Sequence, residues 1–270
     1  MKPVLAGKRI VVTRAREQAR DLIERFCELG ADVLLLPAVS FSPAEDPKEL
    51  DRAVAALADF DWVLFTSANA VRFFMRRCKD LGCALPDRLV GQRPRYAAVG
   101  PATATAAAAE GVRVEIVAQE YSGAALAHEM GALLAGSRVL LPRSQRASPE
   151  LPAALTAKGA KVTEAVAYQT GGMGAYDALV EELFRSGRVD VVAIFSPSAL
   201  ENLRAEFGAE TLHRVASNAA LAAVGPVTAA AIREAGLPVA IQAREATGAS
   251  LVEAVCEYYA VNSFPEARIS

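Results

Sequence analysis

Short apolar runs alternate with amphipathic segments of helical length along the whole chain. The runs are rich in β-branched residues and almost continuously apolar, which is typical of parallel strands that helices cover on both faces. The helices between them have clear ends, because Pro101 and Pro226 stand where a first helical residue tolerates proline and Gly111 and Gly236 follow the last turn. Ten runs are predicted to be strands: 11–13, 33–36, 63–65, 97–99, 114–117, 139–141, 162–167, 191–195, 222–224 and 239–241.

The pattern occurs twice. Residues 96–130 and 221–255 share the order strand, Val-Gly-Pro turn, Ala-rich helix, glycine stop, short strand and Ser/Thr-Gly-Ala helix start. A repeat of this length indicates two similar units, not a solenoid of short repeats. We therefore expect an α/β fold with two similar doubly wound parallel-sheet domains of about five strands each, and a ligand cleft between them. Two further pairs of segments repeat at a spacing of 129 residues: 61–71 with 190–200, and 7–41 with 136–170.

The chain is expected to cross between the domains at two places. Residues 37–47 and 165–174 occupy equivalent positions in the repeats, and both combine an extended stretch with proline or glycine. The simpler boundary, between the repeats at 131–137, has the sequence of a tight helix-to-strand turn. The predicted domains are 1–37 with 171–270, and 40–168, with linkers near 37–43 and 165–172.

Composition narrows the functional classes. The chain has 270 residues, of which 53% are hydrophobic and 22% charged, so it is globular and long enough for two domains. The net charge of −2 and the lack of a basic block point away from nucleic acid and anionic membranes. No apolar run approaches the ~20 residues of a membrane span, and no secretion signal is visible, so we expect a cytoplasmic protein.

Several kinds of catalytic site are not expected. Four cysteines without a Cys-x-x-Cys pair and only two histidines argue against a metal site and against a serine or cysteine triad. No phosphate-binding loop of the G-x-x-x-x-G-K-[ST] type occurs. The glycines at 172 and 174 lack the third glycine of a dinucleotide fingerprint, since Asp177 stands there, which counts against a Rossmann-type transferase.

Candidate chemistry lies at the predicted strand ends. In doubly wound folds, ligands bind there because helix N-termini direct N–H groups outward, an arrangement suited to carboxylates or phosphates. Each Ser or Thr could instead be only a helix cap, and each arginine only a solvated surface residue. The candidate binding residues are Arg14, Ser67, Gly100, Thr103, Ser122, Arg143, Ser196, Gly225 and Thr228.

Tyr168 differs from these candidates because it ends an apolar strand just before a glycine-rich hinge. It could be an aromatic plug that packs the hinge. Alternatively, its phenol lies at the interdomain cleft, where it donates a proton or a hydrogen bond.

An ordered set of segments resembles the uroporphyrinogen III synthase family. No single segment is specific, but their order and spacing cover the chain from about residue 7 to residue 255. The segments are Val12-Thr13-Arg14, Phe65-Thr66-Ser67-Ala68-Asn69-Ala70-Val71, both Ala-Val-Gly-Pro-x-Thr-Ala turns, Ala167-Tyr168-Gln169-Thr170 and Phe195-Ser196-Pro197-Ser198-Ala199.

The resemblance implies a cofactor-free lyase with two α/β domains joined by a two-stranded linker. Such an enzyme converts linear hydroxymethylbilane into uroporphyrinogen III, with loss of water and inversion of ring D through an azafulvene and a spiro intermediate. It also implies Tyr168 as proton donor and Thr103 and Thr228 as hydroxyls at the cleft, with Ser67 and Ser196 as weaker assignments. The second domain departs from the family pattern, because residues 142–146 (PRSQR) are more basic than residues 13–17 (TRARE).

The substrate implied by the resemblance is a polycarboxylate, which suits N–H donors together with Arg14 and Arg143. We expect a monomer, with transient contact with the preceding enzyme of the pathway as a further expectation. The alternative from another class is a non-catalytic, two-lobed ligand-binding or regulatory module, since hinged clefts also serve binding alone.

Overall fold

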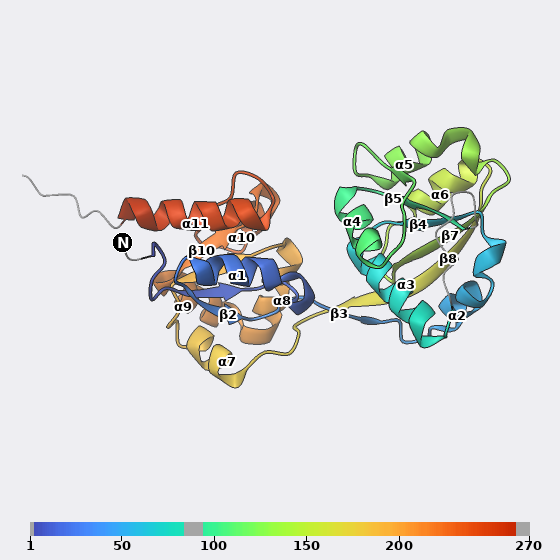
Figure 1. The fold of residues 1–270 in the computed structure, drawn as a ribbon. Helices are drawn as coiled ribbons and strands as arrows, with labels where there is room; N and C mark the ends of the chain where they lie inside the picture. Colours follow the sequence, from blue (N-terminus) through green and yellow to red (C-terminus); the bar gives the residue numbers. More distant parts are fainter. Residues whose placement is uncertain (1–2, 84–93, 263–270) are drawn as a thin grey trace, which may run out of the picture. The chain divides into compact units, whose positions relative to one another are not determined.

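The computed structural model describes residues 3–83 and 94–262 of the chain (Figure 1). Its packing divides the chain into two units, Met1–Ser40 with Gly171–Ser270, and Phe41–Thr170. These bounds lie within a few residues of those expected from the repeat. The chain passes from one unit to the other after Ser40 and again after Thr170.

The first unit contains a five-stranded parallel sheet in the order β11-β10-β9-β1-β2. In the sheet, β2 lies on one side of β1, and the three strands that come later in the sequence lie on the other side. This reversal of winding defines a doubly wound sheet, with its switch point between β1 and β9. The strands are β1 (Arg9–Val12), β2 (Asp32–Leu35), β9 (Val191–Ile194), β10 (Ala220–Ala223) and β11 (Ile241–Gln242).

Alternate residues of these strands pack into two separate hydrophobic cores, one on each face of the sheet. Val11 and Val192 pack with α7, α8, α9 and α10 on one face, whereas Ile10 and Val191 pack with α1 and α11 on the other. Because both faces are covered, the strands are apolar at consecutive positions, as the sequence indicated. The helices are α1 (Arg20–Glu28), α7 (Ala178–Arg185), α8 (Pro197–Phe207), α9 (Ala209–Asn218), α10 (Pro226–Glu234) and α11 (Gly248–Asn262), with a short 3-10 helix, η1 (Arg16–Gln18) (Figure 1).

The second unit contains a six-stranded sheet in the order β3-β8-β7-β4-β5-β6. Its last five strands have the same spatial order as the first unit, and the winding reverses between β4 and β7. The four strand pairs from β8 to β6 are parallel. The strands are β3 (Ser40–Pro43), β4 (Trp62–Phe65), β5 (Arg95–Ala98), β6 (Ile116–Val117), β7 (Arg138–Ser144) and β8 (Lys161–Gly171).

Two cores again cover the faces of this sheet. Val63 and Phe65 pack with α2, α3 and α4, and Trp62 and Leu64 pack with α5 and α6. The helices are α2 (Lys48–Ala55), α3 (Ala68–Asp80), α4 (Pro101–Ala109), α5 (Gly123–Met130) and α6 (Glu150–Ala157), with 3-10 helices η2 (Leu57–Asp59) and η3 (Gly131–Leu134).

The predicted α/β class with two doubly wound parallel-sheet units is confirmed, with one difference in the strand count. The second sheet has six strands, because Ser40–Pro43 forms β3 beside β8. The run Ser-Phe-Ser-Pro at that place is too short and too polar to be recognised as a strand without its neighbour. The two crossings of the chain therefore lie in two hydrogen-bonded strands. Among residues 3–83 and 94–262, no helix is both long and apolar enough to cross a membrane.

Candidate active site

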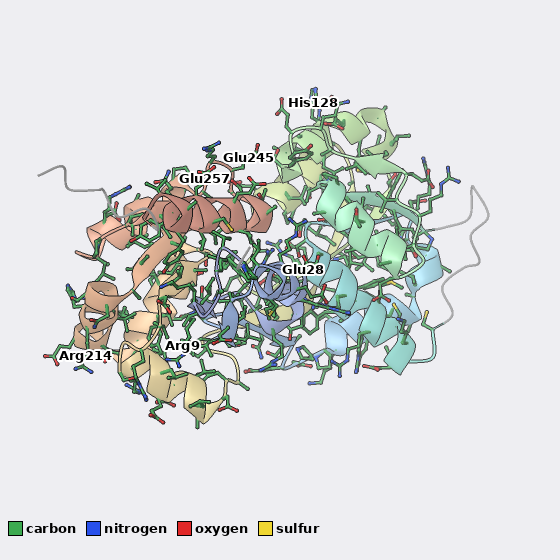
Figure 2. All side chains as sticks on the ribbon, turned by 60° about the vertical axis from the view of Figure 1, so that its left-hand side comes forward. Arg9, Glu28, His128, Arg214, Glu245 and Glu257 are labelled. Carbon is green, nitrogen blue, oxygen red and sulfur yellow. The ribbon has the colours of Figure 1, made fainter. Side chains whose placement is uncertain are left out.

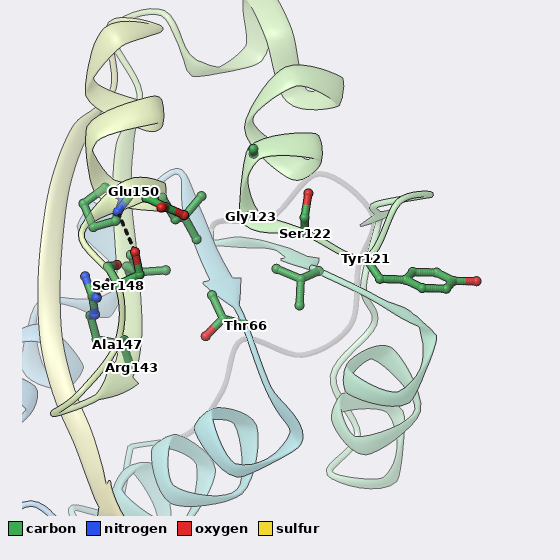
Figure 3. A pocket seen from close by; sticks show the side chains of 13 residues that line it. Thr66, Tyr121, Ser122, Gly123, Arg143, Ala147, Ser148 and Glu150 are labelled. Carbon is green, nitrogen blue, oxygen red and sulfur yellow. Dashed lines mark hydrogen bonds between the residues drawn. The ribbon is translucent and has the colours of Figure 1, made fainter. Parts of the chain in front are cut away.

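A pocket lies at the switch point of the second unit. Its volume is about 290 Å³, and its residues come from the ends of β4, β5 and β7 and from the first turns of α5 and α6 (Figure 3). Ligands of doubly wound folds bind at this place, beyond the carboxyl ends of the strands where the winding reverses. The lining residues are Thr66, Val99, Tyr121, Ser122, Gly123, Ala124, Leu141, Arg143, Ala147, Ser148, Glu150, Leu151 and Pro152.

Arg143 is the cation of this pocket, and it is already neutralised. The whole residue is 7% exposed, and its guanidinium forms an ion pair with Glu164 of β8. The same group donates to the Ser148 carbonyl oxygen at 2.6 Å, which ties the loop before α6 to the end of β7. Because its charge is already paired, Arg143 stabilises the wall of the pocket more than it attracts an anionic ligand.

The rim of the pocket is shaped by Tyr121, whose backbone has φ = +51°. Few residues other than glycine adopt this conformation, and those that do are often found at functional sites. The Tyr121 ring packs against Gly100, where an added Cβ would lie 3.3 Å from a ring carbon. Next to it, the exposed Ser122 caps α5 by accepting from the Ala125 N–H at 3.1 Å. A side chain at Gly100 would therefore press on the Tyr121 ring, and Ser122 serves the helix, whether or not either contacts a ligand.

Tyr168 is brought to the end of β4 by a β-bulge in β8. Arg143 pairs with Val166, but the next residue, Ser144, pairs with Tyr168, so Ala167 is an extra residue in β8. Bulges of this kind change the direction in which a side chain points. The Tyr168 hydroxyl lies 3.1 Å from Ser67 Oγ, and the whole residue is 7% exposed.

Two phenylalanines hold the Tyr168 ring. Phe73 stacks on it with ring centroids 5.4 Å apart, and Phe41 meets it edge-on at 5.9 Å. Such aromatic pairs add to the stability of a buried ring beyond the area they bury. Tyr168 thus packs as an aromatic residue and has Ser67 as a polar neighbour. Its role toward a ligand stays a prediction.

Arg14 occupies the switch point of the first unit, between β1 and β9. Its guanidinium carbon lies 5.5 Å from the centre of the Phe195 ring, and the guanidinium approaches Gly248 at the start of α11. Partial burial lowers the pKa of Arg14, and only Asp21 opposes this effect through its charge. No carboxylate among the described residues forms an ion pair with it, so Arg14 is a half-buried cation whose charge is not neutralised.

The other predicted residues of the first unit lie at helix starts. Ser196 caps α8 by accepting from the Ala199 N–H at 3.1 Å, and Gly225 precedes the first residue of α10. Thr228 of α10 is 3% exposed, and its counterpart in the second unit, Thr103 of α4, is 6% exposed. In these units, therefore, both threonines lie among core residues and neither lines the pocket at Arg143.

The histidines and the buried cysteine lie away from these sites. His128 is exposed on α5 (Figure 2), and His213 is exposed on α9, where its Nδ1 lies 2.9 Å from the Ala209 carbonyl oxygen. Burial raises the pKa of Cys78 to about 12, so this residue is a neutral thiol at physiological pH. None of the three has the partners of an activated base or nucleophile.

Some residues of the site were not predicted from the sequence. Glu164 neutralises Arg143, and Phe41 and Phe73 enclose Tyr168, yet in the sequence each is an ordinary member of a strand or helix. Tyr121 comes directly before the Ser-Gly pair that marks a helix start in the sequence, so its place beside a candidate site could have been noticed. Nothing in the sequence indicated its positive φ. These contacts depend on residues that are distant along the chain.

The fold and these sites define a doubly wound α/β protein of two units, with candidate small-molecule sites at the switch points. Residues 20–253 match the family described as "Uroporphyrinogen-III synthase HemD". The chain belongs to this family, and the resemblance noted in the sequence is confirmed.

Individual relatives agree with the family assignment. The chain is 33% identical over 236 residues to a putative uroporphyrinogen-III synthase of Methanothermobacter thermautotrophicus, covering 84% of this chain and 90% of that one. It is 29% identical over 265 residues to the uroporphyrinogen-III synthase of Synechococcus elongatus, covering 93% and 95%. A crystal structure of a mutant uroporphyrinogen III synthase from Thermus thermophilus has a TM-score of 0.56 at 23% identity, covering 94% of this chain and 100% of that one. This last similarity supports the fold.

Proposed function

We propose that this protein is a uroporphyrinogen III synthase, which cyclises linear hydroxymethylbilane to uroporphyrinogen III with inversion of ring D and release of water, in tetrapyrrole biosynthesis. The observation that carries this proposal is the family match along residues 20–253. The chemistry of the two switch points supports it, because a flexible polycarboxylate must be held in a folded pose by several separate donors. Positioning of this kind is a large source of rate acceleration.

In the proposed reaction, Tyr168 supplies the proton for the first step. The C–O bond of the terminal hydroxymethyl group breaks, the phenol proton joins the departing hydroxyl, and water leaves an azafulvene. The ring-D pyrrole attacks through its substituted carbon, and the spiro intermediate opens and closes again with ring D inverted. A pyrrole-ring proton lost at the end returns to the Tyr168 oxygen, so that substrate equals product plus one water. Support for this role comes from the fixed ring of Tyr168 and its hydroxyl contact with Ser67.

Binding is proposed to use cations and N–H donors differently in the two units. Arg14, whose charge is not neutralised, is the proposed side-chain partner for a substrate carboxylate. In the second unit, Arg143 has Glu164 as its partner, and the N–H groups at the start of α5 are the proposed anion donors of the pocket. Gly100 and Gly225 precede helices that start with proline, so the next free N–H groups of α4 and α10 are available to a ligand.

The remaining expectations stay proposals. We propose that the protein works as a monomer in the cytoplasm, with hydroxymethylbilane as its partner and with transient contact with the enzyme that delivers this unstable substrate. Thr103, Thr228, Ser122 and Ser196 remain proposed substrate contacts through their helix starts.

The experiment that tests the proposal is a coupled assay. Hydroxymethylbilane is generated in situ with the purified protein present, the products are oxidised, and the porphyrin isomers are separated. The expected result is mostly type III isomer, formed faster than spontaneous closure. Only type I isomer, at the spontaneous rate, would contradict the proposal and favour the non-catalytic ligand-binding module.

A further inference from the structure

Ser67 connects the first turn of α3 to Tyr168. Its backbone is extended (φ −160°, ψ 157°), and its Oγ accepts from the Ala70 N–H at 3.0 Å, which makes it the N-cap of α3. The same Oγ lies 3.1 Å from the Tyr168 hydroxyl oxygen. Helix start, serine and phenol therefore form one chain of hydrogen bonds.

The hydrogen-bond capacity of the two hydroxyls limits what this chain can do. A serine hydroxyl has one proton to donate and two lone pairs, and one lone pair of Ser67 is taken by the Ala70 N–H. If Ser67 donates its proton to the Tyr168 oxygen, the phenol proton remains available for a ligand. Once Tyr168 has given that proton away, its oxygen can only accept, and then Ser67 can only be the donor.

The helix and the aromatic neighbours strengthen this arrangement. An N–H donated from a helix N-terminus polarises the Ser67 O–H bond, and hydrogen bonds in a chain reinforce one another. Phe73 and Phe41 fix the plane of the Tyr168 ring, so its oxygen stays within reach of Ser67. The phenol is thus held in one direction by contacts on three sides.

The repeated unit shows that this contact is not a consequence of the helix cap. Ser196 stands at the equivalent place and caps α8 in the same way, through the Ala199 N–H at 3.1 Å. Its second polar neighbour is Ser198 Oγ at 3.0 Å, and the residue that corresponds to Tyr168 is Val39. A capping serine thus needs no tyrosine, and the Ser67–Tyr168 contact is particular to the second unit.

We propose that Ser67 is a positioning residue for Tyr168: it donates its O–H to the phenol oxygen, which directs the Tyr168 proton toward the ligand and stabilises the oxygen after the proton has left. This inference rests on the proposed function, in which Tyr168 is the acid. It replaces the expectation that Ser67 contacts substrate directly. Ser67 then affects the chemical step, and substrate affinity hardly at all.

Three substitutions separate this role from capping. Ser67→Ala removes both the cap and the donor, Ser67→Thr keeps both, and Ser67→Asp keeps the cap but has no proton to donate at neutral pH. In the coupled assay we expect kcat to fall about 10-fold in Ser67→Ala, the size of one hydrogen bond to a developing charge, with KM within about twofold of wild type. Ser67→Thr should restore kcat, and Ser67→Asp should be at least as slow as Ser67→Ala.

Ser196→Ala is the matched control for stability. It removes the same cap in the other unit, so its melting temperature should fall about as much as that of Ser67→Ala, by roughly 2–4 °C each. If Ser67→Asp keeps both the wild-type melting temperature and the wild-type kcat, the role is capping alone and the proposal is wrong. A rise in KM with unchanged kcat in Ser67→Ala would also contradict it, since Ser67 would then bind substrate.

A spectroscopic measurement keeps this inference separate from the proposed function. In protein labelled with ¹³C at the tyrosine ring carbon that bears oxygen, the Tyr168 signal should shift in Ser67→Ala, return in Ser67→Thr and stay in place in Ser196→Ala. A Tyr168 signal that is the same in Ser67→Ala and wild type would overturn the inference even in an active enzyme. If wild type makes only type I product, the proposed function fails, and the signal still decides whether Ser67 holds the Tyr168 hydroxyl.

Discussion

The two units have the same strand order around their switch points, yet the arginines at equivalent places differ. Arg14 lies two residues after β1 and Arg143 is the penultimate residue of β7, and the two are one repeat of 129 residues apart in the sequence. Arg14 is half-buried, lies over the Phe195 ring and has no carboxylate partner among the described residues. Arg143 is almost fully buried and paired with Glu164. Among the described residues, an arginine at equivalent positions thus has an unpaired charge in the first unit and stabilises a pocket wall in the second.

The tyrosine shows the same asymmetry. The second unit has Tyr168 beside its capping serine, whereas the first unit has Val39 at the corresponding position. The repeated backbone provides helix N-termini in both units, because strand ends and helix starts are part of the fold. The comparison teaches that both units have helix N-termini suited to anions because of their shared fold, whereas the proposed proton donor is a side chain that only the second unit has at this position.

Tyr168→Phe is expected to have the largest effect on this comparison, because it removes a hydroxyl that the first unit lacks at the corresponding position, Val39. We expect kcat for type III product to fall about 100-fold, the lower range for loss of a general acid, with little change in melting temperature. The coupled assay measures the first quantity and thermal unfolding the second. Tyr176→Phe is the control, since Tyr176 donates to Glu206 in the first unit and should leave kcat unchanged. Wild-type kcat in Tyr168→Phe would show that the tyrosine is only a packing residue.

Matched arginine substitutions test the difference between the switch points. Arg14→Gln should raise KM about 10-fold, because a charged hydrogen bond to substrate is lost, and should change the unfolding free energy by less than about 0.5 kcal/mol. Arg143→Gln should instead lower the unfolding free energy by about 2 kcal/mol, since it leaves the Ser148 carbonyl and Glu164 without their partner. Urea unfolding and substrate saturation curves give the two quantities for both variants.

The contrast between the arginines would be refuted by the reverse result. If Arg14→Gln unfolds much more easily while Arg143→Gln raises KM and keeps its stability, then the substrate charge is held in the second unit. Equal effects on both quantities would mean that the ion pair with Glu164 does not distinguish the two sites.

The smallest expected effect concerns acid stability. Asp51 of α2 accepts from Arg77 of α3 at 2.6 and 2.7 Å, and these hydrogen bonds lower the pKa of Asp51 below its usual 3.8. In the first unit the corresponding helix α7 has its pair within the helix, Glu181 with Arg185. Because the Asp51 pKa is lower in the folded state, its contribution is present above the unfolded value and is lost as the pH falls through the folded value.

We expect Asp51→Asn to lower the unfolding free energy by about 0.5–1 kcal/mol at pH 7, since the pair is partly exposed, and this difference should shrink as the pH is lowered from 3.8 toward 2. Urea unfolding at both pH values measures the difference, and Glu181→Gln is the control for a pair within one helix. A difference that persists unchanged at pH 2 would show that the Asp51 contribution does not depend on its charge.

Particular elements show why the fold could be predicted from the sequence. β9 is apolar at every position and β1 at every position after Arg9, and the capping serines and Gly-Pro turns mark helix starts without help from the rest of the chain. These are local preferences, so the sequence states them directly. The local pattern did not predict β3, because Ser40–Pro43 becomes a strand only through its pairing with β8; only the family resemblance, which implied a two-stranded linker, pointed to it.

The sequence by itself determined the repeat, the strands and helices, the helix caps and the family. Tertiary structure alone decided which repeated residues act differently. Strict alternation would turn Tyr168 away from the face that holds Ala165 and Ala167, but the bulge at Ala167 brings all three to one core cluster. Likewise, Glu164 lies 21 residues from Arg143 and meets it only because β8 pairs with β7. Local patterns specify backbone conformation, whereas the charge and direction of a side chain depend on partners that only the folded chain brings together.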